Sequence, residues 1–269
     1  MRNIPVSYIS IIILGFLLAG ILSCGCEEEN EATEDSRTVG WNLWESFFLG
    51  NATGGVYGLQ NNAFTQYQDI RIVFDDLTPG DPLEEELQLT FCRQSDNLVI
   101  GAPCSNILHY DTENDIFEGF LAPPVDGEWK LEMNWAGDVI YHRSYITINV
   151  QPVNPYPRVL ESITGLNREI FAWIEPVAPG IGLQEFKIMA WHQANGILHY
   201  EPDSMMILSL RVYQVSTARP SAGNIDPQHI GDGMYEGTVN FDQPGDWGAT
   251  LLNMETEPED TLVTFLFDF

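Results

Sequence analysis

Hydrophobic and polar residues alternate over short segments along most of the chain. In the last segment, Val263, Phe265 and Phe267 would share one face of a strand, with Thr264 and Asp268 on the other. No segment after residue 23 keeps a helical period for three turns. The predicted strands span residues 68–75, 86–92, 145–150, 186–191, 205–215 and 261–269. Gly, Pro and Asn/Asp clusters separate them at the spacing of antiparallel sandwiches, so we expect an all-β fold.

One motif occurs twice, as FEGFLAPPVDGEWKLEM at 117–133 and as MYEGTVNFDQPGDWGAT at 234–250. The ungapped matches pair Phe117 with Tyr235, Glu118 with Glu236, Gly119 with Gly237, Gly127 with Gly245, and Trp129 with Trp247. We expect each copy to be a hairpin of one sheet, whose Trp begins the return strand and is buried in a core. The glycines at 119 and 237 would lie where a facing sheet or a large ring approaches the backbone.

The repeat predicts two tandem domains of about 100 residues each. Pro152, Pro155 and Pro157 lie between the copies, and proline cannot donate a ladder hydrogen bond. We therefore expect a linker at 152–166, a first immunoglobulin-like sandwich at 39–151 and a second at 167–269. About 230 residues remain after the N-terminal segments, which is enough for two domains.

The N-terminal segment has the pattern of a secretory signal at residues 1–23, with Arg2 followed by a short apolar stretch. The step from Ile21 to Cys24 resembles the lipobox of bacterial lipoproteins, in which the cysteine is acylated. This implies a cell-envelope protein anchored at Cys24, in the outer membrane on its periplasmic side or at the cell surface. A plain signal peptide that leaves a free thiol is the alternative. The acidic run that follows predicts a disordered tether at 24–38.

The formal net charge of −28 at pH 7 disfavours nucleic acid and anionic membrane surfaces as partners. Beyond the anchor region, Cys92 and Cys104 lie twelve residues apart in one predicted domain. In an oxidising compartment this pair favours a disulfide that closes a hairpin, and two buried thiols are the alternative.

The pattern Gly-x-Gly-x-Tyr-Glu-Gly-x-Val-x-Phe…Gly-x-Trp from Gly231 to Trp247 resembles the YtkA/FixH-like domain. That family consists of small extracytoplasmic immunoglobulin-like sandwiches, several of them linked to copper handling or oxidase assembly. A lipobox followed by two such domains looks like the tandem lipoproteins of Bacteroidetes-type bacteria. The resemblance implies the fold of 65–150 and 168–269, more specifically in the second half than in the first.

The metal chemistry of that family is largely missing from this chain. Relatives tend to carry Met-Pro-Ser-Met-Gly-His before the second motif, whereas Arg219 to Asn224 read RPSAGN here. Soft thioethers and imidazoles suit copper, and they have been replaced at these positions. Six other residues of the second domain remain as copper candidates: Met189, His192, His199, Met205, Met206 and His229.

Motifs of catalysis are missing from the sequence as well. It holds no His-Glu-x-x-His, no Gly-x-Ser-x-Gly, no phosphate loop and no dinucleotide fingerprint. We therefore expect a non-catalytic binding or structural module that contacts an envelope protein or an extracellular ligand. A copper-binding accessory protein of the YtkA/FixH type is the alternative, and metal titration separates the two.

Overall fold

The computed structural model describes residues 35–75, 86–95, 98–136, 141–164, 167–194, 196, 198–256 and 258–269, and over these residues it contains strands and no helix. In that part of the chain, no helix is long and apolar enough to span a membrane. The predicted signal and the predicted acylation site Cys24, with most of the predicted tether, lie outside the described residues.

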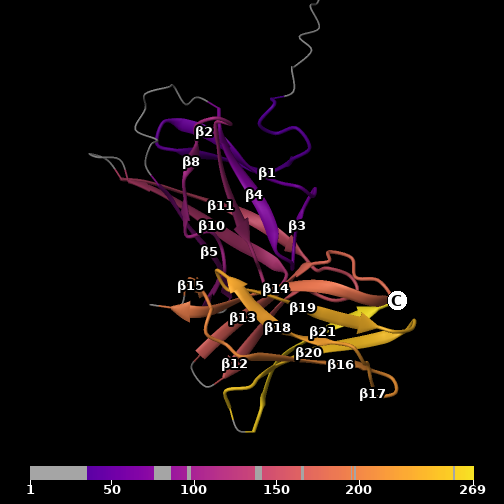
Figure 1. The fold of residues 1–269 in the computed structure, drawn as a ribbon. Helices are drawn as coiled ribbons and strands as arrows, with labels where there is room; N and C mark the ends of the chain where they lie inside the picture. Colours follow the sequence, from indigo (N-terminus) through magenta and orange to yellow (C-terminus); the bar gives the residue numbers. More distant parts are fainter. Residues whose placement is uncertain are drawn as a thin grey trace, which may run out of the picture. The chain divides into compact units, whose positions relative to one another are not determined.

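Two sheets face each other in the first half of the chain (Figure 1). One has the order β1-β2-β4-β9-β8, formed by β1 (Asn42–Leu49), β2 (Ala52–Gly58), β4 (Gln68–Phe74), β9 (Ile116–Leu121) and β8 (Tyr110–Asp111). The other has the order β3-β11-β10-β5-β6, formed by β3 (Ala63–Phe64), β11 (Tyr141–Gln151), β10 (Gly127–Ala136), β5 (Leu87–Ser95) and β6 (Leu98–Ala102), and β7 (Ile107–Leu108) also pairs with β5. Apart from the parallel pair β3 and β11, the strands of both sheets pair antiparallel.

The second half repeats this plan. One sheet has the order β12-β13-β14-β19-β18, formed by β12 (Val159–Thr164), β13 (Asn167–Glu175), β14 (Gly182–Ala194), β19 (Met234–Phe241) and β18 (Ile225–Gly231), and β15 (His199–Pro202) also pairs with β14. The facing sheet has the order β17-β16-β20-β21, formed by β17 (Arg219–Pro220), β16 (Leu208–Gln214), β20 (Asp246–Asn253) and β21 (Asp260–Asp268).

Each half has the strand arrangement of an immunoglobulin constant domain, with ABED in one sheet and CFG in the other. In the second half, β13, β14, β19 and β18 take the places of A, B, E and D, and β16, β20 and β21 take those of C, F and G. In the first half, β2, β4, β9 and β8 match the first set, and β5, β10 and β11 match the second. The predicted fold class, two tandem immunoglobulin-like sandwiches, is therefore confirmed.

Each sandwich buries a core of its own between its two sheets. Along β21, Val263, Phe265 and Phe267 point into the second core, as the alternating pattern predicts. The largest fully buried side chains are aromatic in both halves. Aromatic rings bury the most area per residue, so they dominate the stability of these small cores.

The repeated motif is not a hairpin, and that prediction is wrong. β9 and β10 belong to different sheets of the first sandwich, and so do β19 and β20 in the second. The turn between them carries the chain from one sheet to the facing one, which places both segments against the same core. A hairpin and a crossing of this kind both alternate hydrophobic and polar residues, so the pattern alone could not separate them.

The two tryptophans of the motif are buried at these crossings, as predicted. Trp129 and Trp247 are 1% and 0% exposed. Each indole N–H donates to the carbonyl four residues upstream, at 3.0 Å to Val125 and at 2.9 Å to Gln243. Because a buried N–H without an acceptor is costly, this bond lets each ring lie fully in its core. The position corresponds to the tyrosine corner at the start of strand F in immunoglobulin domains.

The glycines of the motif have two separate roles. Gly127 and Gly245 have φ of +111° and +129°, values that side-chain-bearing residues rarely adopt. At Gly237 a Cβ would lie 2.8 Å from the ring of Phe186, so the predicted close approach of a large ring is confirmed there. At Gly119 it would meet the side chain of Leu108 at 2.5 Å, and Leu108 lies on β7 of the facing sheet, so the predicted close approach of that sheet is confirmed there.

The predicted linker at 152–166 is too long. Residues 159–164 form β12, which pairs antiparallel with β13. Val159 is fully buried and Leu160 packs against the second core. The prolines end before this segment, so they do not prevent it from joining a sheet.

The predicted disulfide is absent, because Cys92 and Cys104 are free thiols in the structure. Cys92 follows Phe91, which is fully buried, and side chains alternate between the faces of a strand, so Cys92 points away from the core. Cys104 belongs to the core of the first sandwich. The two sulfurs therefore lie on opposite faces of one sheet. Burial raises the pKa of Cys104 to about 12.

Replacing Trp247 with Ala should lower the free energy of unfolding by about 3–5 kcal/mol, because it removes a fully buried ring. Trp247→Phe should cost less, since it removes the indole hydrogen bond and keeps most of the apolar area. Chemical denaturation followed by circular dichroism measures both. Leu183→Ala is the control: Leu183 is 65% exposed, and its change should stay within about 0.5 kcal/mol. A loss below about 1 kcal/mol for Trp247→Ala would contradict this role.

Alkylation of the unfolded, non-reduced protein should label both Cys92 and Cys104, as read by peptide mass mapping. In the native protein Cys104 should resist alkylation at pH 8, because it is buried and its pKa is raised to about 12. A peptide in which the two cysteines are cross-linked would show that the thiols are not free.

Candidate functional site

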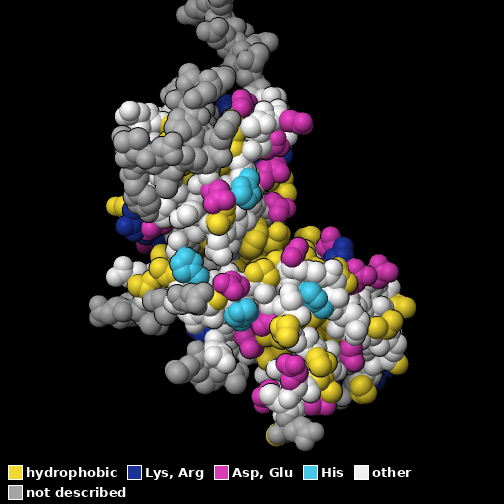
Figure 2. Space-filling view, turned by 60° about the vertical axis from the view of Figure 1, so that its left-hand side comes forward, with side chains coloured by type: hydrophobic (Ala, Val, Ile, Leu, Met, Phe, Trp, Pro, Cys, Tyr) yellow, Lys and Arg dark blue, Asp and Glu magenta, His cyan; other side chains and the backbone are white. Residues whose placement is uncertain are grey.

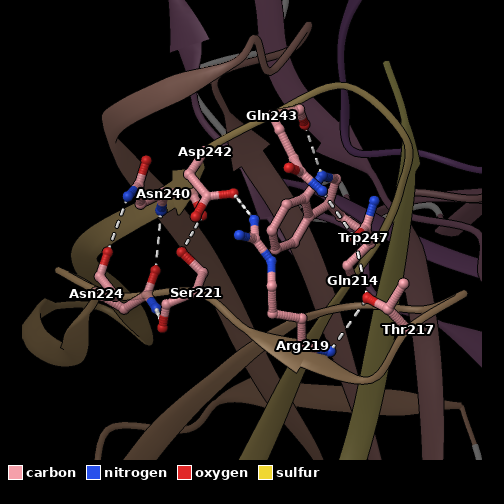
Figure 3. Close-up of polar contacts among 10 residues, drawn as sticks. Gln214, Thr217, Arg219, Ser221, Asn224, Asn240, Asp242, Gln243 and Trp247 are labelled. Carbon is pink, nitrogen blue, oxygen red and sulfur yellow. Dashed lines mark hydrogen bonds and ion pairs between the residues drawn. The ribbon is translucent and has the colours of Figure 1, made fainter.

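The loop before β18 and the crossing between β19 and β20 form one polar network at an end of the second sandwich (Figure 3). Arg219 forms an ion pair with Asp242. Asn240 donates its backbone N–H to Asn224 Oδ1 at 2.9 Å and its side-chain amide to the Ala222 carbonyl at 2.8 Å. The two segments are thus held together by side chains that the sequence separates by some twenty residues.

Gln214 at the end of β16 joins the same network (Figure 3). Its Oε1 accepts hydrogen bonds from Thr217 Oγ1 at 2.9 Å and from Gln243 Nε2 at 2.8 Å. The Gln243 carbonyl in turn accepts the indole N–H of Trp247 at 2.9 Å. The network therefore connects the surface loop to the buried ring at the sheet crossing.

These polar groups bind one another and contain no activated nucleophile. Arg219 and Asn224 occupy the positions at which the resemblance implies Met and His, and the structure pairs them with Asp242 and Asn240. An ion pair and amide hydrogen bonds hold the loop here. The arrangement can fix the shape of the loop, and its chemistry is that of a structural contact.

The six copper candidates are spread over different environments. Met206 belongs to the core of the second sandwich, whereas Met189 lies in a separate apolar cluster. Met205 is 83% exposed. His199 is exposed on β15, and the ring of His229 lies 5.2 Å from that of Tyr235. Figure 2 shows histidines at separate places on one face of the molecule. Among the described residues, no three His, Cys, Asp or Glu side chains are grouped so that they could hold a metal ion.

His192, the sixth candidate, lies in a polar cluster with Asp203 and Glu169. Its Nδ1 is 3.4 Å from Asp203 Oδ2, without the geometry of a hydrogen bond. Glu169 pairs with His192 across β13 and β14, and its Oε2 is buried with no hydrogen-bond partner among the described residues. Burial, and then the charge of Asp203, raise the pKa of Glu169, which the nearby His192 partly offsets. The cluster therefore holds a carboxylate that is costly to keep charged.

A third apolar cluster joins the two sandwiches. It contains Ala122 from the first half and residues of β12 to β15 from the second, including Trp191 and Tyr200, which are 1% and 2% exposed. Phe120 stacks on Trp191 with ring centroids 5.6 Å apart. The Asn106 amide donates to the Tyr200 carbonyl at 3.2 Å, and the Arg158 N–H to the Thr65 carbonyl at 3.0 Å. Apolar burial and hydrogen bonds thus hold the sandwiches against each other.

A groove opens beside this cluster, with a volume of about 260 Å³. Its walls come from both sandwiches and include Gln66, Tyr67, Asp69, Arg158, Trp173 and Glu175. A neighbouring hollow shares Tyr67 and Asp69 with it. The groove combines a concave shape, aromatic walls and charged groups, which are the usual features of a ligand site.

No pattern in the sequence predicted this groove. Its residues come from the segment after β2, from the loop before β4 and the start of β4, from the segment before β12, and from the end of β13 and just beyond it, so no local motif marks them. The one hint in the sequence is Arg158, a basic residue in an acidic chain that directly follows Pro157 in the predicted linker. The segment from Arg219 to Asn224 was noted in the sequence for its position before the second motif. The structure adds its contact with Asp242, through the ion pair with Arg219.

Comparison with known proteins adds little to this description. No family model matches the chain, and no curated protein matches it. Among solved structures, the D00-D0 domain of Intimin is similar at 13% identity and a TM-score of 0.25, over 78% of this chain and 95% of that one. The D0-D1 domain of Intimin is similar at 8% identity and a TM-score of 0.24, over 79% and 96%. Similarity at this level supports no conclusion about function.

Glu169→Gln should stabilise the protein at neutral pH. The folded-state pKa of Glu169 is raised, so the wild type loses stability as the pH rises from the unfolded pKa through the folded one. The gain in the variant should therefore shrink as the pH falls below the unfolded pKa of glutamate, near 4.3. Thermal unfolding of both proteins between pH 4 and pH 8 measures this difference in stability. Glu185→Gln, at an exposed position of β14, is the control, and a gain in Glu169→Gln that does not depend on pH would contradict the explanation.

Proposed function

We propose that this chain is a non-catalytic, lipid-anchored binding or structural module of a bacterial cell envelope. The observation that carries the proposal is the buried cluster between the sandwiches, built around the stack of Phe120 on Trp191. Two domains that share a buried contact present their loops and sheet faces as one surface. Such a surface suits the binding of a partner, or a structural role in which the two domains keep a fixed distance between the molecules that they contact.

The polar contacts support a structural role better than a catalytic one. The network around Gln214 and Arg219 is closed on itself, and each of its side chains has a partner within the chain. Catalysis usually needs a nucleophile next to a base, with a third group that orients the base. The close pair of His and carboxylate in the described residues is His192 and Asp203, and the hydroxyl that contacts Asp203, that of Tyr235, donates to its backbone carbonyl at 2.9 Å.

The location follows from the sequence, through the apolar stretch and the lipobox-like step that ends at Cys24. Acyl chains on this cysteine would hold the chain at the membrane, at about 0.8 kcal/mol for each buried CH₂. The resemblance of Gly231–Trp247 to extracytoplasmic YtkA/FixH-like domains supports the same location. The scattered positions of the six Met and His candidates give no support to the copper-binding alternative.

In a Gram-negative host, the full-length protein should sediment with membranes and form a discrete adduct with an envelope component after formaldehyde treatment of intact cells. Cys24→Ala should release the protein from the membrane fraction, because it removes the acylated residue. Trp191→Ala should stay in the membrane and lose the adduct, because it removes the ring that stacks between the sandwiches. Immunoblots of fractionated and cross-linked cells measure both effects.

Cys26→Ala is the matched control, since it removes a cysteine two residues away and should keep both the anchor and the adduct. Membrane retention of Cys24→Ala would refute the lipid anchor. An adduct that is unchanged in Trp191→Ala would refute a binding surface that needs both sandwiches, and no adduct in the wild type would refute the binding role.

A further inference from the structure

Arg158 differs in its surroundings from most arginines of the described residues. Five arginines of the described residues form ion pairs with carboxylates: Arg71, Arg143, Arg168, Arg211 and Arg219. Arg158 has no carboxylate within 4 Å in the part of the chain that the structure describes, although the protein holds 39 acidic residues against 11 basic ones. In so acidic a chain, a guanidinium without a carboxylate partner calls for an explanation.

The Arg158 side chain is held in place from one side. Its Nη1 donates to the Leu266 carbonyl at 3.1 Å, and the guanidinium lies 4.3 Å from the centre of the Phe267 ring. Burial lowers its pKa to about 10, since no nearby carboxylate supports the charge. A guanidinium has five N–H donors in a planar fork, so this one bond leaves most of them for another acceptor.

The same side chain lines the groove between the sandwiches. None of its nitrogens is both buried and unpartnered, so the remaining donors are open to solvent or to a ligand. A planar fork that is partly desolvated and fixed by a ring stack suits the bidentate binding of a carboxylate. This part of the groove is therefore complementary to an anion.

Other walls of the groove have the opposite character. Asp69 and Glu175 contribute carboxylates, and Gln66 contributes an amide. Asp69 forms no ion pair with Arg158, so the two charges do not neutralise each other. Burial raises the pKa of Asp69, which a hydrogen bond from Tyr67 partly offsets, and the charge of Glu118 raises it further. A ligand that donates hydrogen bonds to Asp69 would favour its charged form.

We propose that the groove binds a small organic carboxylate that also carries hydroxyl or ammonium donors, with the carboxylate on Arg158 and the donors on Asp69. The volume of about 260 Å³ lies just below the range of drug-sized pockets, so it suits a single sugar acid or amino acid. Tyr67 and Ile174 contribute apolar groups to the lining of the groove. This site rests on the proposed binding role and adds a class of ligand to it. The two proposals are tested separately, because a chain that binds no carboxylate can still form the cross-linked envelope adduct.

The test is isothermal titration calorimetry of the full chain with D-glucuronate and with L-serine. Both compounds carry a carboxylate and hydrogen-bond donors, but one is an acidic sugar and the other an amino acid. D-Glucose and L-serinamide are the matched compounds without the carboxylate. At least one acid should bind, and its partner without the carboxylate should bind roughly tenfold more weakly, because the charged pair is lost. Glucuronate alone would point to an acidic sugar, and serine alone to an amino acid.

Arg158→Gln should weaken the binding roughly tenfold or more, and Arg158→Lys should weaken it less, since it keeps the charge without the fork. Asp69→Asn should weaken binding several-fold, because it lowers the acceptor strength of the opposite wall. Arg211→Gln removes an arginine that is paired with Glu259 outside the groove and should leave the affinity unchanged. Circular dichroism identifies any variant that does not fold.

If Arg158→Gln does not fold, Arg158→Lys and Asp69→Asn decide the question. The proposal is overturned if neither acid binds at about 10 mM, a concentration above the usual range of weak small-ligand affinities. It is also overturned if glucose or serinamide binds as well as its acid, or if the folded Arg158 and Asp69 variants keep the wild-type affinity.

Discussion

Each half of this protein depends on a single crossing, the point where the chain leaves one sheet and enters the facing one beneath a buried tryptophan. Trp129 and Trp247 fill the cores at these points, and each indole donates to the carbonyl four residues upstream. The bond satisfies the polar atom of an otherwise apolar ring, and Gly127 and Gly245 supply the backbone angles that the turn needs. The position of the two sheets relative to each other follows from this contact.

A second level of organisation joins the sandwiches. The apolar cluster around Phe120 and Trp191 excludes water between the halves, and backbone hydrogen bonds at its edge fix their orientation. The groove exists because of this contact, since its walls come from both halves. This candidate ligand site is thus a product of the duplication, because neither sandwich contains it alone.

The candidate sites show how far the sequence can be used. The segment from Arg219 to Asn224 was marked by its pattern, because loop residues next to a repeated motif stand out. Its partner Asp242 could be placed there only by the structure, since the contact depends on how the loop folds over the crossing. Arg158 and Asp69 lie about ninety residues apart and share no motif, so local reasoning had no means to link them.

The sequence by itself determined the strands β4, β5, β11, β14, β16 and β21, the duplication and the burial of both tryptophans, because these follow from local alternation and from a repeat that can be read directly. It did not determine which strands share a sheet, and so a crossing was taken for a hairpin. It also favoured a bond between Cys92 and Cys104, which lie on opposite faces of one sheet. Only the tertiary structure decided pairing, facing and the groove, because these depend on contacts between residues far apart in the chain.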